Sequence, residues 1–149
     1  MAKRVLVVED DLLNRMLFCA WLEGDEFEVE PVADGKEVLD KARTFGPDLI
    51  IMDIQLPNVS GVQLIESLRA DPKLHEIPVL AVTGYVGKGE ERRVRTAGAR
   101  DFLPKPVTNK VFVAAVERLL SAPANGSGDG NASRKGRSSS VPPSGSLPS

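Results

Sequence analysis

The sequence predicts a three-layer α/β fold, in which helices cover both faces of a parallel β-sheet. Three short runs are apolar with almost no alternation: Val5–Val8, Leu49–Met52 and Ile77–Val82. Unbroken apolar runs of this length are typical of strands that are buried on both faces. A segment with helical periodicity follows each run, and the strand-then-helix unit recurs five times along the chain. Short loops between such units require right-handed crossovers and therefore a parallel sheet.

The first helix is predicted over Leu12–Leu22, and Asp10 or Asp11 is expected to cap its N-terminus. The helical periodicity groups four residues on one apolar face, namely Leu13, Met16, Leu17 and Ala20. The next segment, Phe27–Val32, alternates apolar with charged residues and contains Pro31. This pattern predicts an edge strand, because only an edge tolerates a missing ladder donor and solvated side chains.

The remaining elements follow the same alternation. A second helix begins at Asp34-Gly35, a third carries Val62, Ile65 and Leu68, and further helices are predicted over residues 88–97 and 109–120. A last short strand covers residues 101–103. With the second strand at an edge, the expected strand order is 2-1-3-4-5, which is the flavodoxin-like arrangement.

Composition limits the class of protein. The chain has 149 residues and a formal net charge of −2, which indicates neither a basic nucleic-acid surface nor a strongly acidic one. No apolar run approaches the roughly 18 residues that a membrane span needs, and the N-terminus is too short for a signal peptide. The single cysteine, Cys19, cannot form an internal disulfide, so a reducing, cytoplasmic setting is expected.

Two parts of the chain differ sharply in composition. Residues 1–121 are predicted to form the folded domain. In residues 122–149, 17 of the 28 residues are Gly, Pro or Ser, with almost no large apolar side chain. Such a segment cannot offset the entropy lost on ordering, so a disordered tail is expected.

Charged and polar side chains follow four of the five strands. Glu9 and Asp10 follow the first strand, Asp53 the third, Thr83 ends the fourth and Lys105 follows the fifth. In open parallel sheets, sites form outside the carboxyl ends of the strands, so these groups are expected to converge. Clustered carboxylates with solvent access suit a hard divalent cation such as Mg2+. Lys105 and Thr83 could then hold phosphate oxygens, with Asp53 as nucleophile and site of an aspartyl phosphate.

Four motifs in this order resemble a two-component response-regulator receiver domain, the CheY-like family. They are Val-Leu-Val-Val-Glu-Asp-Asp, Met-Asp-Ile-Gln-Leu-Pro, Ala-Val-Thr-Gly and Leu-Pro-Lys-Pro, and the resemblance covers Lys3 to about Leu120. Within the family, the chain is most similar to DivK-type single-domain regulators of alphaproteobacterial cell cycle and development. The stretch Met-Asp-Ile-Gln-Leu-Pro-Asn-Val-Ser-Gly carries part of that closer likeness.

The resemblance implies a phosphorylation switch. Asp53 would accept a phosphoryl group from a histidine kinase or a histidine phosphotransfer protein, and Thr83 and Lys105 would grip the phosphate. Mg2+ would be bound directly by Asp10, Asp53 and the backbone carbonyl of Gln55, and through water by Glu9. The Lys105–Pro106 bond is expected to be cis.

The resemblance also implies where the signal leaves the domain. Phe102 stands at a switch position that is often tyrosine in the family, so no step can use a phenol hydroxyl there. The downstream protein target is expected to bind the fourth helix, fifth strand and fifth helix. No DNA-binding motif follows the domain in this sequence.

The same residues match two other classes of site less well. A haloacid-dehalogenase-type phosphatase would carry a second Asp where Gln55 stands, and Gly87-Lys88-Gly89 lacks the spacing of a phosphate-binding loop. A scaffold that binds partners without being phosphorylated is the alternative that stays open. A receiver is not expected to be a conventional enzyme, since it catalyses at most its own phosphotransfer and dephosphorylation.

Overall fold

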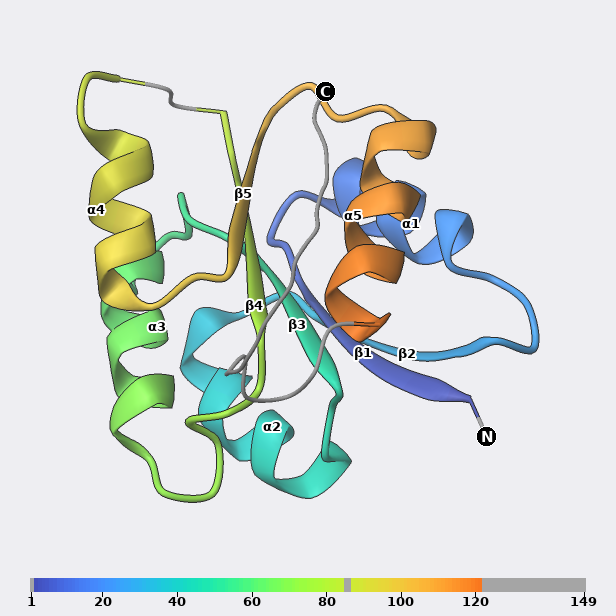
Figure 1. The fold of residues 1–149 in the computed structure, drawn as a ribbon, viewed down its shortest axis with the longest axis horizontal. Helices are drawn as coiled ribbons and strands as arrows, with labels where there is room; N and C mark the ends of the chain where they lie inside the picture. The colour runs from blue at the N-terminus through green and yellow to red at the C-terminus, as the bar shows by residue number, and fades with distance from the viewer. Residues whose placement is uncertain (1, 85–86, 122–149) are drawn as a thin grey trace, which may run out of the picture.

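The computed structural model describes residues 2–84 and 87–121 and shows five parallel strands in the order β2-β1-β3-β4-β5 (Figure 1). The strands are β1 (Lys3–Val8), β2 (Phe27–Val32), β3 (Leu49–Asp53), β4 (Val79–Thr83) and β5 (Asp101–Pro104). The helices are α1 (Leu12–Trp21), the 3-10 turn η1 (Gly35–Glu37), α2 (Val38–Phe45), α3 (Gly61–Ala70), α4 (Glu90–Ala97) and α5 (Asn109–Ser121). The predicted fold class and strand order are confirmed, including the edge position of β2. The tail predicted over residues 122–149 lies outside the described residues.

The sheet separates two apolar layers, because successive side chains of a strand point to opposite faces. Leu6, Ile50 and Ala81 face the layer made with α2, α3 and α4. Their chain neighbours Ile51 and Leu80 face the layer made with α1 and α5. In Figure 1, α3 and α4 therefore lie on one side of the sheet, and α1 and α5 on the other. Burial on both faces explains why β3 and β4 show no polar alternation in the sequence.

Helix α1 buries a different face from the one that its apolar pattern marks. Its buried residue is Phe18, whose ring stacks on Phe112 of α5 with centroids 4.8 Å apart. Trp21 packs edge-on against the same Phe112 ring. The residues predicted to form one apolar face are instead solvent-exposed: Leu13 at 65%, Met16 at 59%, Leu17 at 39%, together with Ala20. The helix thus has two apolar faces, of which only one packs against the sheet.

Local packing fixes the loops at the carboxyl edge of the sheet. Asp11 caps α1 by accepting a hydrogen bond from the Asn14 N–H at 2.9 Å. Gly61 starts α3 against the end of β3, where a Cβ would stand 2.6 Å from the Ile54 Cα. Only glycine allows this approach, which holds the loop after Asp53 against the strand it leaves. The Lys105–Pro106 bond is cis, as expected.

Among the described residues, no helix has the length and apolar character needed to cross a membrane.

Candidate functional site

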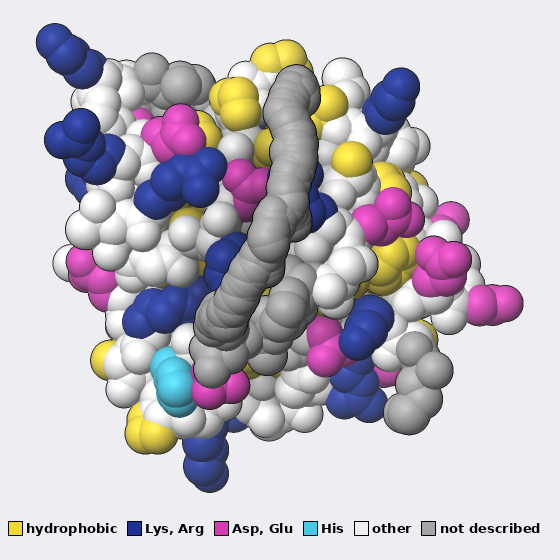
Figure 2. Space-filling view, viewed as in Figure 1, with side chains coloured by type: hydrophobic (Ala, Val, Ile, Leu, Met, Phe, Trp, Pro, Cys, Tyr) yellow, Lys and Arg dark blue, Asp and Glu magenta, His cyan; other side chains and the backbone are white. Residues whose placement is uncertain are grey.

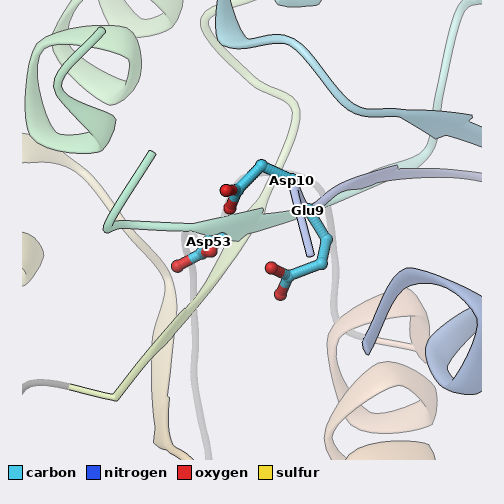
Figure 3. Close-up of side chains that lie close together, drawn as sticks. All are labelled: Glu9, Asp10 and Asp53. Atoms are coloured by element: carbon cyan, nitrogen blue, oxygen red, sulfur yellow. The ribbon is translucent and has the colours of Figure 1, made fainter. Parts of the chain in front are cut away.

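Three carboxylates meet at the carboxyl edge of the sheet. Glu9 and Asp10 follow β1, and Asp53 ends the neighbouring strand β3. One carboxylate oxygen from each lies within 4.8 Å of the other two, and Figure 3 shows the three side chains turned toward a common space. Glu9 and Asp53 are buried, at 0% and 3% exposure, whereas Asp10 reaches solvent. The cluster is therefore an acidic pocket with one open side.

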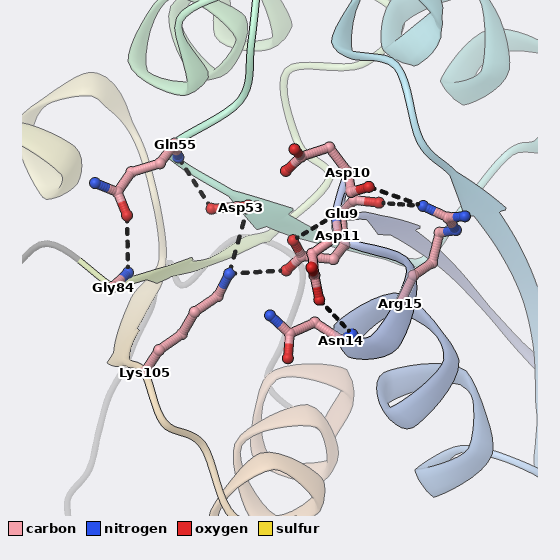
Figure 4. Close-up of polar contacts among 9 residues, drawn as sticks. All are labelled: Glu9, Asp10, Asp11, Asn14, Arg15, Asp53, Gln55, Gly84 and Lys105. Carbon is pink, nitrogen blue, oxygen red and sulfur yellow. Dashed lines mark hydrogen bonds and ion pairs between the residues drawn. The ribbon is translucent and has the colours of Figure 1, made fainter.

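Lys105 supplies the positive charge of this pocket. Its ammonium lies 3.0 Å from Glu9 Oε1 and 3.5 Å from Asp53 Oδ2 (Figure 4). The contact with Glu9 is an ion pair without hydrogen-bond geometry, and Glu9 Oε1 has no hydrogen-bond partner among the described residues. One lysine thus faces three carboxylates, and an excess of negative charge remains in a largely buried site.

The pKa values of the pocket reflect this excess. Burial is the largest cause that raises the pKa of Asp53, and the neighbouring Glu9 raises it as well. The Gln55 N–H and Lys105 lower it, and together these effects leave the pKa at about 6. Burial also raises the pKa of Asp10, with a second contribution from Asp53. Burial alone would lower the pKa of Lys105, but Glu9 and Asp53 outweigh it and leave that pKa raised. The metal-free pocket therefore disfavours its own negative charge.

The other predicted residues lie around this cluster. Thr83 is fully buried at the end of β4, and its carbonyl accepts the Lys105 N–H at 2.8 Å, so the two residues are held together by the backbone. The Gln55 N–H donates to Asp53 Oδ1 at 2.9 Å. Phe102 is already buried, at 7% exposure, in the layer that contains α4. Its role in switching stays a prediction.

Two contacts at the site could not be identified from the sequence. Arg15 of α1 donates to the carbonyl oxygens of Glu9 at 2.9 Å and of Asp10 at 3.3 Å, so it braces the loop that carries both acids. The Gln55 side chain accepts the Gly84 N–H at 3.1 Å and connects the exits of β3 and β4 (Figure 4). Neither contact follows from periodicity or spacing, because each depends on how a long side chain crosses a loop.

This geometry supports two kinds of chemistry. Clustered carboxylate oxygens with one open side are the ligands that hard divalent cations prefer. Asp53 is a carboxylate nucleophile that faces a lysine, which could neutralise the charge of an incoming phosphoryl group. The five predicted groups, on Glu9, Asp10, Asp53, Thr83 and Lys105, do come from adjacent strand exits.

The family is decided by comparison with known proteins. A model of the response regulator receiver domain matches residues 5–117. The chain belongs to the response regulator receiver family. The receiver is also 42% identical over 120 residues to the "Polar-differentiation response regulator DivK" of Brucella ovis, a match that covers 80% of this chain and 98% of that protein. The same figures hold for DivK of Brucella anthropi.

Solved receiver structures share the fold. The chemotaxis response regulator CheY4 of Vibrio cholerae is 27% identical, with a TM-score of 0.74, and the match covers 80% of this chain and 99% of that one. The receiver domain of the sensor histidine kinase PA1611 from Pseudomonas aeruginosa is also 27% identical, with a TM-score of 0.75 and coverage of 82% and 100%. That structure holds a magnesium ion coordinated in its active-site cleft. Membership of this family confirms a signalling domain and not a conventional enzyme.

The raised pKa of Asp53 predicts that, without a bound metal ion, the ionised carboxylate lowers the free energy of unfolding in a pH-dependent way. Since the pKa of about 6 in the folded state lies above the ordinary aspartate value of 3.8, the folded state keeps this proton to higher pH, and stability falls as pH rises between these values. Asp53→Asn should therefore raise the free energy of unfolding at pH 7 by roughly 1 to 3 kcal/mol, with little gain at pH 4. Denaturant unfolding in EDTA at both pH values measures this difference.

Asp25→Asn, at an exposed carboxylate in the turn before β2, is the matched control and should change stability little at either pH. A destabilised or unchanged Asp53→Asn protein at pH 7 would contradict the electrostatic account of the pocket.

Proposed function

We propose that this receiver is a phosphorylation-dependent switch, in which Asp53 accepts a phosphoryl group from the phosphohistidine of a kinase or phosphotransfer protein. The observation that carries the proposal is a buried Asp53 that lies between two further acids and Lys105. In the transfer, the donor's phosphorus–nitrogen bond breaks while a phosphorus–oxygen bond forms to an Asp53 carboxylate oxygen. The imidazole nitrogen leaves with the electron pair of the broken bond.

The residues of the chain have distinct roles in this step. Lys105, 3.5 Å from Asp53 Oδ2, is placed to neutralise phosphoryl oxygens as negative charge arrives. Thr83 would donate its hydroxyl to one of these oxygens, and its carbonyl contact with the Lys105 N–H would couple the two groups. The Gln55 N–H orients Asp53 through Oδ1, which leaves Oδ2 on the lysine side.

The acidic pocket fits a Mg2+ ion. Its ligand atoms lie within 4.8 Å of one another, and the buried Glu9 Oε1 has no hydrogen-bond partner among the described residues. Asp10, Asp53 and the Gln55 carbonyl would hold the ion, with Glu9 reaching it through water. When bound, Mg2+ would offset the charge of the carboxylates and of the phosphoryl oxygens. The magnesium seen in the PA1611 receiver supports this assignment.

The exposed apolar face of α1 is the surface that we propose for the phosphodonor. This donor face consists of Leu12, Leu13, Met16 and Leu17, at 39% to 65% exposure. It borders a hollow of about 390 Å³ that Leu17, Trp21 and Lys105 help to line. Because Lys105 belongs to both the hollow and the site, a helical hairpin with apolar side chains could dock here and present its phosphohistidine to Asp53.

The β5 edge of the sheet, with α4 and α5 on either side of it, carries the surface that we propose for the downstream target. Residues 84–121 hold 8 basic and 4 acidic residues, whereas residues 1–83 hold 8 basic and 16 acidic ones. Figure 2 shows Lys and Arg side chains gathered over α4. Arg95 pairs with Glu91 and Asp101, and Arg118 of α5 also contacts Asp101, while Arg92 makes no ion pair within residues 2–84 and 87–121. Ion pairs therefore connect the elements of this α4-β5-α5 face, and Arg92 remains available to a partner.

The relatives indicate a setting for the switch. Since the chain is 42% identical to DivK proteins, which are named for polar differentiation, we propose a role in cell cycle or development. The site is proposed to act in the cytoplasm, through contacts with proteins and not with DNA. The alternative is a scaffold that binds its partners without phosphorylation. The two proposals differ in whether Asp53 accepts a phosphoryl group.

Phosphorylation itself separates the switch from the scaffold. Incubation with phosphoramidate or acetyl phosphate and Mg2+ should add one phosphoryl group, seen as a mass increase in intact-protein mass spectrometry. Asp53→Ala should remove the modification, and EDTA should slow it strongly, since the carboxylate cluster then faces the phosphoryl oxygens without a cation. Asp48→Ala, at an exposed carboxylate just before β3, is the control and should be labelled like wild type. A wild-type protein that is not labelled would favour the scaffold.

Substitutions on the two proposed surfaces should impair different steps, transfer from the donor and binding of the target. Met16→Glu puts a charge on the donor face and should lower kcat/KM for transfer from a histidine kinase or phosphotransfer protein about tenfold or more, with labelling by phosphoramidate unchanged. Arg92→Glu should leave both transfers unchanged and weaken binding of the target to the phosphorylated protein. Radiolabel transfer and pull-down with the phosphorylated protein measure the two effects. Equal loss of donor transfer in both variants would contradict the separation of the surfaces.

A further inference from the structure

We propose that the Gln55 side chain acts as a resting-state restraint, which ties the exit of β3 to the exit of β4 until Asp53 is phosphorylated. The restraint is the hydrogen bond from the Gly84 N–H to Gln55 Oε1, called here the Gln55–Gly84 bridge. The inference rests on the proposed function, because its release depends on a phosphoryl group at Asp53.

Gln55 contacts both sides of the site. Its own N–H donates to Asp53 Oδ1 at 2.9 Å, and its side-chain oxygen accepts the Gly84 N–H at 3.1 Å. Figure 4 shows the side chain reaching across from the end of β3 to Gly84. Gln55 and Gly84 are both exposed, so packing alone does not fix the side chain there. One residue therefore connects the phosphoacceptor with the segment that leads to α4.

Gly84 lies beside the Lys105 side chain, close to the proposed phosphorylation site. It follows the buried Thr83 directly, and a Cβ built on it would stand 3.3 Å from Gln55 Oε1 and 3.9 Å from Lys105 Cδ. The Gly84 backbone thus borders the same space as the Lys105 side chain. Backbone N–H groups at such loop positions are good donors to anionic oxygens. In the resting protein this donor is already occupied by the neutral Gln55 carboxamide.

Phosphorylation is expected to change the acceptor to which the Gly84 N–H donates. A phosphoryl group brings three strong acceptor oxygens and close to two negative charges, and hydrogen bonds to charged acceptors are stronger than those to neutral amides. The Gly84 N–H is therefore expected to exchange Gln55 Oε1 for a phosphoryl oxygen. This exchange frees the Gln55 side chain and draws the exit of β4 toward Asp53. The bridge thus stabilises the resting state alone, and it opposes switching by the free energy of one neutral hydrogen bond.

The test compares Gln55→Met, which keeps the side-chain length but removes the acceptor, with wild type. Gln63→Met is the matched control, since Gln63 is an exposed glutamine on α3 whose side chain makes no hydrogen bond within the described residues. Two readouts are used: the NMR shift and hydrogen exchange of the Gly84 amide in the resting protein, and the affinity for beryllofluoride in Mg2+. Beryllofluoride imitates a phosphoryl group on a carboxylate.

In Gln55→Met, the Gly84 amide should exchange faster and shift its resonance, and beryllofluoride should bind roughly two- to tenfold more tightly, because no resting hydrogen bond has to break. Gln63→Met should match wild type in both measurements. An unchanged Gly84 amide, or beryllofluoride affinity that is unchanged or weaker in Gln55→Met, would overturn the inference. A merely structural role of Gln55 would weaken binding and not tighten it.

The outcome also distinguishes the inference from the function on which it rests. If wild type fails to bind beryllofluoride at all, the phosphorylation switch is wrong, and the restraint with it. The Gly84 amide is measured without any phosphoryl mimic, so an unchanged signal there overturns the bridge alone and leaves the switch standing.

Discussion

The crowding of Glu9, Asp10 and Asp53 around a single lysine is the constraint on which the rest of the structure depends. Buried carboxylates are costly unless charge compensates them, and Lys105 compensates only part of this cluster. The fold sustains the arrangement because β1, β3 and β4 are buried on both faces by two apolar layers. The free energy gained by burying these layers offsets the unfavourable electrostatics of the acidic cluster at one edge of the sheet, which we propose as a cation site.

The strand order explains how the pocket reaches two separate surfaces. β1 and β3 are neighbours at the centre of the sheet, so their exits bring the acids together. Lys105 follows β5, and its side chain reaches past the exit of β4 to contact Glu9 and Asp53, while its N–H donates to the Thr83 carbonyl at the end of β4. From this centre, α1 leads to the apolar donor face on one side of the sheet. The exit of β4 leads to the charged α4-β5-α5 face at the β5 edge, so the surfaces that we propose for donor and target consist of different residues.

Much of the fold could be predicted because strands buried on both faces leave unbroken apolar runs, and because parallel strands end at one edge. Glu9, Asp53 and Lys105 could be assigned to one site on that ground alone. The face of α1 that is buried could not be predicted, because the helix carries two apolar faces and amphipathicity does not show which one packs against the sheet. Met16 belongs to the exposed face, and Phe18 to the buried one. The Gln55–Gly84 bridge was equally inaccessible, since it joins two loops through a side chain that no pattern distinguishes.

The central claim is that this acidic pocket is a cation site whose ligands include Asp10, and calorimetric titration with Mg2+ tests it most directly. Asp10→Asn removes one carboxylate from the cluster, whereas Asp11→Asn makes the same change one residue later, at the exposed cap of α1, where asparagine caps equally well. The account predicts that Asp10→Asn weakens Mg2+ affinity about tenfold or more and that Asp11→Asn leaves it close to wild type. Equal affinities in all three proteins, or the larger loss in Asp11→Asn, would contradict it.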